Sequence, residues 1–172
     1  DESLPTGLDP KPSWRRPDER FLAEGYLREL QYEKWASPAQ REAVWLALKA
    51  PPRSTSLIAL PTGAGKSLCF QALARFGTGL TVVVVPTVAL AHDHLRSAEE
   101  RFPADSRVKA RAFAAGENAD SVLAAVKSRS CRLLFTAPEA CVSGRLKTIL
   151  ETAAKDGWLE NLVIDEAHII ET

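Results

Sequence analysis

Residues 60–67 read LPTGAGKS, and the sequence on either side of this stretch decides the fold class. A short apolar run over 56–60 comes directly before it. A stretch with helical periodicity over 66–76 follows it and ends at Gly77. A glycine-rich turn that leads from a strand into a helix through Lys and Ser is typical of a phosphate-binding loop. The sequence therefore predicts a strand, a phosphate-binding loop and a helix, in that order.

The residue types of this loop have a chemical reason. Gly63 and Gly65 let backbone N–H groups surround a polyphosphate without Cβ clashes, and the positive end of the helix points at the same charge. The Lys66 ammonium can reach the β- and γ-phosphates, and the Ser67 hydroxyl is expected on Mg²⁺. The usual pattern has Gly where this chain has Leu60. The expected nucleotide-binding residues of the loop are Thr62, Gly63, Ala64, Gly65, Lys66 and Ser67.

A second signal lies over 162–168, which read LVIDEAH. An apolar strand here delivers two adjacent carboxylates at its carboxyl end, and in a parallel sheet that edge is also where a phosphate-binding loop lies. We expect Asp165 to hold Mg²⁺ partly through water, and Glu166 to accept a proton from the water that attacks the γ-phosphate. The alternative is a surface Asp–Glu pair at a strand end. The position of Asp165 and Glu166 downstream of a phosphate-binding loop favours the catalytic interpretation.

Short apolar runs and helical stretches alternate along the rest of the chain. Alternation of this kind predicts an α/β fold in which a mostly parallel sheet is covered by helices on both faces. The expected strands are 56–60, 81–85, 108–114, 132–136 and 162–165, and the expected helices are 21–30, 38–48, 66–76, 88–102, 119–127 and 145–155.

Composition excludes several classes of protein. With 45% apolar and 26% charged residues, the 172-residue chain is globular rather than disordered. Lys plus Arg and Asp plus Glu number 22 each, so no net positive charge draws the chain to nucleic acid and phosphate binding must be local. There is no membrane-spanning apolar run or signal pattern, which predicts a cytoplasmic protein. Three cysteines at unrelated spacings favour neither disulfides nor a zinc site.

Three segments are expected from the local composition. Residues 1–20 hold four of the eleven prolines and predict a flexible arm. Residues 21–53 predict a helical segment, and 54–172 predict the nucleotide-binding lobe, truncated at its C-terminal end. The chain begins at Asp1 and contains no Met. We therefore expect an excerpt of a longer protein.

Two histidines on the predicted helix 88–102 stand outside these signals. His92 and His94 are two residues apart, so they point to different faces of a helix and cannot easily share a metal ion. The interpretation that the residues favour is a pair of solvated helix side chains, with a place near nucleic acid for Asp93 or His94 as the alternative.

Four segments resemble the motifs of superfamily 2 helicases, most closely the RecQ-like DNA helicases, and they follow one another along the chain in the family's order. Residues 61–71 (PTGAGKSLCFQ) resemble motif I and 165–168 (DEAH) resemble motif II. Residues 85–93 resemble motif Ia and 136–139 resemble motif Ib, two loops that touch the nucleic-acid backbone in the family. The resemblance implies a three-layer RecA-like P-loop NTPase lobe that uses ATP and Mg²⁺. It also implies nucleic-acid contacts at Pro86, Thr87, Asp93, Pro138 and Glu139, and a coupling role for His168.

The segment before the loop resembles the adenine-binding motif of RecQ-like enzymes. Tyr32 and Trp35 stand where an aromatic ring would cover the base, and Gln40 where an amide would read its edge. The chain departs from the motif at Ala36, where those enzymes have Arg, and the distance from Trp35 to Gln40 is one residue longer. Gln40 has a rival role, because from the third helical position it can cap the backbone N–H of Ser37.

The function implied by the resemblance is the ATP-binding lobe of an ATP-dependent DNA helicase, coupling ATP hydrolysis to strand translocation and unwinding. DNA and a second RecA-like lobe of the same protein are the expected partners. Arginines from that lobe are expected to complete the site, so the chain alone should turn over little ATP. The alternatives are a double-stranded DNA translocase, an RNA helicase, a motor subunit of a DNA modification or phage-defence system, a P-loop small-molecule kinase, or a nucleotide-binding adaptor that never hydrolyses.

Overall fold

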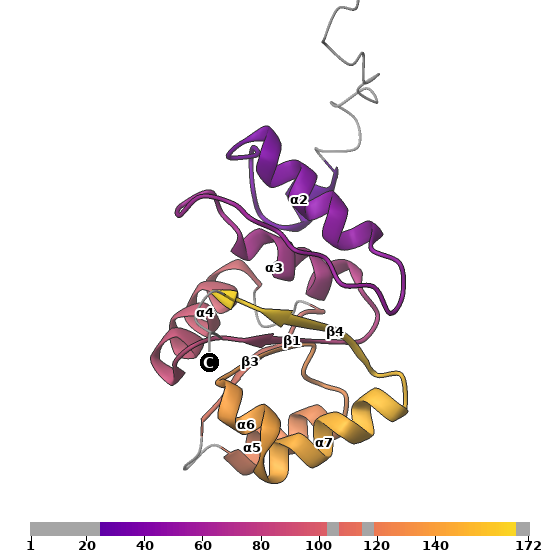
Figure 1. Cartoon of the computed structure of the whole chain (residues 1–172). Helices are drawn as coiled ribbons and strands as arrows, with labels where there is room; N and C mark the ends of the chain where they lie inside the picture. The colour runs from indigo at the N-terminus through magenta and orange to yellow at the C-terminus, as the bar shows by residue number, and fades with distance from the viewer. Residues whose placement is uncertain (1–24, 103–106, 115–118, 168–172) are drawn as a thin grey trace, which may run out of the picture.

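The computed structural model describes residues 25–102, 107–114 and 119–167 and contains one parallel four-stranded sheet (Figure 1). The strand order is β2-β3-β1-β4, and every neighbouring pair is parallel. The α/β fold class predicted from the sequence is therefore confirmed. The expected arm over 1–20 and His168 lie outside the described residues. The strands are β1 (Leu80–Val84), β2 (Ala110–Phe113), β3 (Leu133–Thr136) and β4 (Leu159–Ile164).

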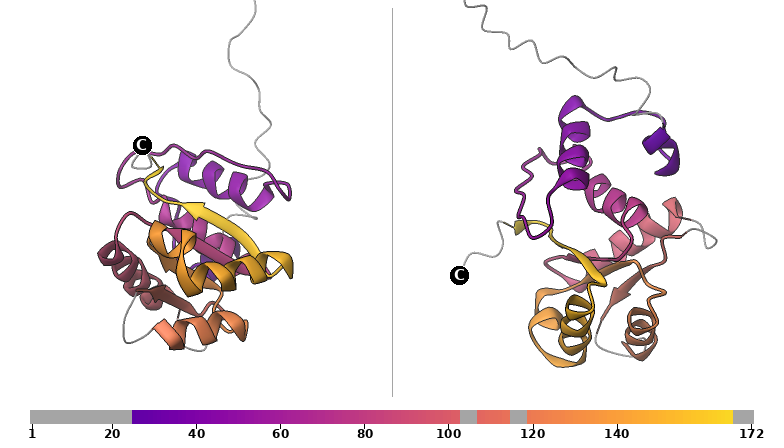
Figure 2. Two further views of the ribbon diagram at one scale, coloured as in Figure 1. Left: turned by 60° about the horizontal axis from the view of Figure 1, so that its bottom comes forward. Right: turned by 90° about the vertical axis from the view of Figure 1, so that its right-hand side faces the viewer.

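Helices cover both faces of the sheet, with α2 to α4 on one face and α5 to α7 on the other (Figures 1 and 2). Residues 25–29 add a helical turn to the first group, and both Leu27 in this turn and Leu30 directly after it are buried. The helices are α2 (Pro38–Lys49), α3 (Ser67–Phe76), α4 (Val88–Arg101), α5 (Ala119–Lys127), α6 (Pro138–Val142) and α7 (Gly144–Lys155).

Two apolar clusters, one on each face of the sheet, hold these layers together. Each strand contributes to both clusters, because its successive side chains point to opposite faces. Val83 and Phe135 belong to the cluster under α3 and α4, whereas Val82 and Leu134 belong to the cluster under α5 and α7. All five residues of β1 are buried. A strand buried on both faces explains the uninterrupted apolar run over 82–85.

Side chains fix the starts of two helices. The Ser37 hydroxyl accepts a hydrogen bond from the Gln40 backbone N–H at 3.1 Å, directly before Pro38 at the first position of α2. The Thr87 hydroxyl accepts from the Leu90 N–H at 3.2 Å and starts α4. Both are the caps expected of Ser and Thr, since each satisfies a backbone N–H that has no partner within the helix.

The predicted strand over 56–60 is wrong. Residues 54–60 have no regular secondary structure and pair with no strand in the described part of the chain, and the Leu57 side chain is 86% exposed. The run has β-forming residues, but such a preference needs a neighbouring strand to be realised. The sequence also did not predict α6, a short helix that begins at Pro138.

Two predictions from composition can be compared with the structure. The three cysteines form no disulfide, and Cys69 and Cys131 are buried. None of the helices among the described residues is both long and apolar enough to cross a membrane.

The core predicts how stability responds to truncation. Leu134 is fully buried in the β3 strand, so Leu134→Ala should lower the free energy of unfolding by about 2–5 kcal/mol. Leu46 on α2 is 50% exposed, and Leu46→Ala should change it by less than about 0.5 kcal/mol. Urea unfolding followed by circular dichroism measures both. Equal losses for the two variants would contradict the layer arrangement.

Candidate nucleotide site

The loop over 61–66 has the backbone conformation that its glycines allow. Gly63 and Gly65 have φ angles of 78° and 76°, in the left-handed region that disfavours residues with a Cβ. The Ala64 N–H donates to the Pro61 carbonyl at 3.1 Å and closes a turn. Helix α3 then starts at Ser67 with no side-chain cap on it. A turn of this shape leads directly into a helix N-terminus, which favours bound anions.

Gln40 supports this loop from α2. Its Nε2 atom donates to the Gly65 carbonyl at 3.1 Å, and its Oε1 atom accepts from the Ala36 backbone N–H at 2.8 Å. A Cβ on Gly65 would collide with the Gln40 amide. The side chain is 4% exposed. The prediction that it caps the N–H of Ser37 is wrong, because the amide reaches one residue further back, to Ala36.

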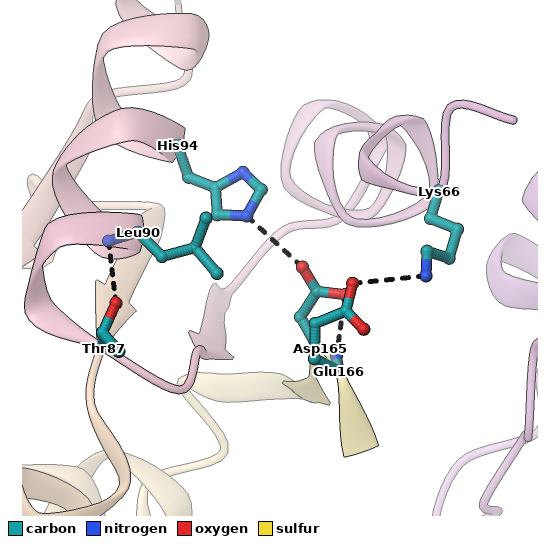
Figure 3. A network of polar contacts seen from close by, with 6 residues as sticks. All are labelled: Lys66, Thr87, Leu90, His94, Asp165 and Glu166. Atoms are coloured by element: carbon teal, nitrogen blue, oxygen red, sulfur yellow. Dashed lines mark hydrogen bonds and ion pairs between the residues drawn. The ribbon is translucent and has the colours of Figure 1, made fainter. Parts of the chain in front are cut away.

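The acidic end of β4 lies beside Lys66 at the end of the glycine turn (Figure 3). The Asp165 backbone N–H donates to the Val84 carbonyl at 2.9 Å, which continues the β1–β4 pairing past the end of the strand. Glu166 then turns with a φ of 53°, and its N–H donates to Asp165 Oδ1 at 3.0 Å. The Lys66 Nζ atom lies 3.4 Å from Glu166 Oε1. The glycine turn and the two carboxylates are therefore joined in one site.

Asp165 has a second polar neighbour in α4. The Nε2 atom of His94 lies 3.3 Å from Asp165 Oδ2, at ion-pair distance but without the alignment of a hydrogen bond. The polar contact with His94 is the largest influence that lowers the pKa of Asp165; partial burial opposes it, and the Glu166 N–H and nearby charges on His94 and Lys66 lower it further. The carboxyl is therefore ionised at neutral pH.

The placement of His94 corrects the sequence prediction. Its side chain is only 19% exposed, whereas His92 lies on the exposed face of α4. The prediction of two solvated histidines is thus wrong for His94. The signal was present in the sequence: His94 is three residues after Ala91 and four before Ala98, both of which are buried, so it shares their face of the helix.

The two aromatic residues expected to cover a base lie near α3. The Tyr32 hydroxyl donates to Gln71 Oε1 at 3.2 Å, and the Arg101 guanidinium lies 4.1 Å from the centre of the ring. One face of this ring is therefore already in contact with Arg101. Trp35 is half-buried and packs against the cluster under α3 and α4. Adenine contact by these two residues stays a prediction.

The residues expected to touch nucleic acid lie after the carboxyl ends of two paired strands. Val84 of β1 is in register with Thr136 of β3, so the segments that follow them start side by side. The expected residues Pro86, Thr87 and Asp93 follow β1, and Pro138 and Glu139 follow β3. Thr87, Asp93 and Glu139 are exposed. Asp93 pairs with Arg96 at 3.6 Å on the outer face of α4.

The oxygen donors of the site suit Mg²⁺. Asp165 offers an ionised carboxylate that is 17% exposed, and the Ser67 hydroxyl lies at the start of α3. In the described ranges, no group of three or more His, Cys, Asp or Glu side chains could hold a metal ion. One carboxylate and one hydroxyl fit Mg²⁺, which proteins usually hold through one or two carboxylates together with water and substrate phosphates.

The chain matches known helicases over most of its length. Residues 37–172 match the family model "DEAD/DEAH box helicase". The ATP-dependent DNA helicase RecQ of Synechocystis sp. is 32% identical over 154 residues, which are 89% of this chain and 30% of the relative. The ATP-dependent DNA helicase Q5 of Mus musculus is 30% identical over 156 residues, 88% of this chain and 15% of the relative.

A third relative, the RecQ-like DNA helicase blm-1 of Caenorhabditis elegans, is 34% identical over 116 residues, which are 67% of this chain and 12% of the relative. The chain thus spans less than a third of the length of each of these relatives. The family match includes both the glycine turn and the acidic end of β4, which the structure joins at Lys66 and Glu166. The chain therefore belongs to the DEAD/DEAH box helicase family, and it is RecQ-like within it.

Proposed function

We propose that this chain is the ATP-binding lobe of an ATP-dependent DNA helicase, in which ATP hydrolysis drives translocation along a strand and unwinding. The contact between Lys66 Nζ and Glu166 Oε1 at 3.4 Å carries the proposal. It brings a phosphate-binding lysine and a carboxylate that can act as a base to the same place. A nucleotide-binding adaptor that never hydrolyses has no need of this second group.

The residues of the proposed site have different chemical roles. The backbone of the loop and Lys66 hold the phosphates, so Lys66 exchanges Glu166 for the nucleotide as its partner. Glu166 orients the attacking water and accepts its proton. Ser67 and Asp165 would hold Mg²⁺, which when bound would supply positive charge to offset the charge that develops on the phosphates. Arginines of a second lobe complete this charge stabilisation in the proposed whole protein.

DNA binds in this proposal along the segments that follow β1 and β3. Their starts are adjacent because Val84 and Thr136 are paired, and Thr87 and Glu139 are exposed there. Contacts from such positions go to phosphates and sugars rather than to base edges. The proposal therefore includes little sequence preference.

The first test separates binding from hydrolysis. In the intact protein, Lys66→Ala should abolish DNA-stimulated ATP hydrolysis because the phosphates lose their cation. Glu166→Gln should keep the affinity for a fluorescent ATP analogue and lower kcat by about 100-fold or more, because an amide cannot accept the proton. Phosphate release and fluorescence titration measure the two effects.

A matched control for the charge change is Lys155→Ala, since Lys155 is exposed at the end of α7, far along the chain from the loop. This variant should hydrolyse ATP as the unchanged protein does. Full turnover in Lys66→Ala or Glu166→Gln would count against the proposal. An ATPase rate that nucleic acid does not change would favour a small-molecule kinase, and strand separation of RNA but not DNA duplexes would favour an RNA helicase.

A second test concerns the base. We propose that Gln40, held between Ala36 and Gly65, reads the adenine edge while it supports the loop. ATP should then displace a labelled ATP analogue much better than GTP does. Gln40→Ala should weaken ATP binding and narrow the difference between ATP and GTP. If GTP competes equally well with the unchanged protein, Gln40 serves the loop alone and the adenine assignment fails.

A further inference from the structure

His94 reaches the proposed magnesium ligand from a helix that belongs to neither the glycine turn nor the acidic strand end. It projects from α4 and places Nε2 3.3 Å from Asp165 Oδ2 (Figure 3). The other carboxylate oxygen, Oδ1, accepts from the Glu166 N–H at 3.0 Å. The two oxygens of Asp165 thus have separate neighbours, and the two contacts together limit the rotation of the carboxylate.

Two aromatic rings hold the imidazole in place. The His94 ring stacks on Phe135, with 5.5 Å between centroids and 16° between planes. Phe70 meets it edge-on at 5.4 Å, and the two phenylalanines contact each other at 5.7 Å. Phe135 lies in β3 and Phe70 in α3, and both are buried. The imidazole therefore has little freedom to turn away from Asp165.

The carboxylate determines which atom of the His94–Asp165 contact is the hydrogen-bond donor. A carboxylate oxygen can only accept, so in this contact at 3.3 Å the His94 Nε2 atom is the one that would donate. Nε2 is buried and makes no aligned hydrogen bond within the described residues. A polar atom in this state gains by a closer contact with the carboxylate, and such contacts in enzyme sites often tighten when substrate binds.

We propose that His94 is a positioning residue for Asp165: its Nε2–H holds the carboxylate in the orientation that receives Mg²⁺ with the nucleotide. The inference rests on the proposed ATP site and adds to it a residue from α4. Partners that orient a metal ligand usually matter nearly as much as the ligand, and their loss costs 10–100-fold in metal affinity or activity.

Two substitutions separate the N–H group from the ring. In the intact protein, His94→Gln keeps an N–H donor and loses the ring, whereas His94→Phe keeps a ring on Phe135 and loses the donor. The affinity for Mg²⁺, measured as the concentration that half-saturates binding of a fluorescent ATP analogue, should fall about tenfold or more in His94→Phe. His94→Gln should keep most of it. Thermal unfolding should rank the two variants in the opposite order.

The matched control is His92→Phe, the same change two residues earlier on the exposed face of α4. With no nucleic acid present, it should leave the affinity for Mg²⁺ and the nucleotide analogue unchanged. In an Asp165→Asn background, His94→Phe should have little further effect on Mg²⁺ affinity, because the group that it positions has lost its charge.

Three results would overturn the inference: equal Mg²⁺ affinity in His94→Phe and the unchanged protein, a lower affinity in His94→Gln than in His94→Phe, or full additivity with Asp165→Asn. Each leaves the proposed function standing if the unchanged protein hydrolyses ATP and Lys66→Ala does not. A protein that binds no nucleotide at all would instead overturn the proposed function, and this inference with it.

Discussion

The parallel pairing of β1 with β4 is the constraint on which the site depends. Val83 and Val84 are in register with Val163 and Ile164, and the Asp165 N–H continues the ladder by donating to the Val84 carbonyl at 2.9 Å. This bond fixes where the chain leaves the sheet. A shift of one residue would turn Asp165 to the other face and separate it from α4. The left-handed turn at Glu166 then directs the second carboxylate to Lys66.

The parts of the site that the sequence predicted are those with local causes. Gly63 and Gly65 are required by a turn that the chain makes within a few residues, and Asp165 follows an apolar strand whose end is visible in the sequence. The strand expected over 56–60 failed for the converse reason. Its formation depends on a neighbouring strand, and no described strand lies beside it, although its residues favour β structure.

Gln40 and His94 make contacts with residues far away in the sequence, and local sequence patterns do not predict these contacts. Gln40 was singled out, but its contact with Gly65 joins residues 25 positions apart and depends on how α2 packs on α3. The contact of His94 with Asp165 joins α4 to the end of β4. Helical spacing alone places His94 on the buried face with Ala91 and Ala98. Which group it meets there depends on the strand order, which the sequence does not state.

Helix α4 connects two parts of the molecule that have different tasks in the proposed function. Its cap, Thr87, is exposed where the proposal has DNA, and His94 lies seven residues further, roughly 10 Å along the axis at 1.5 Å per residue. Ala91 and Ala98 bring the helix close to the sheet, and the stack of His94 on Phe135 ties it there. In the proposed function, α4 therefore joins the segment where DNA would bind to the histidine that faces Asp165.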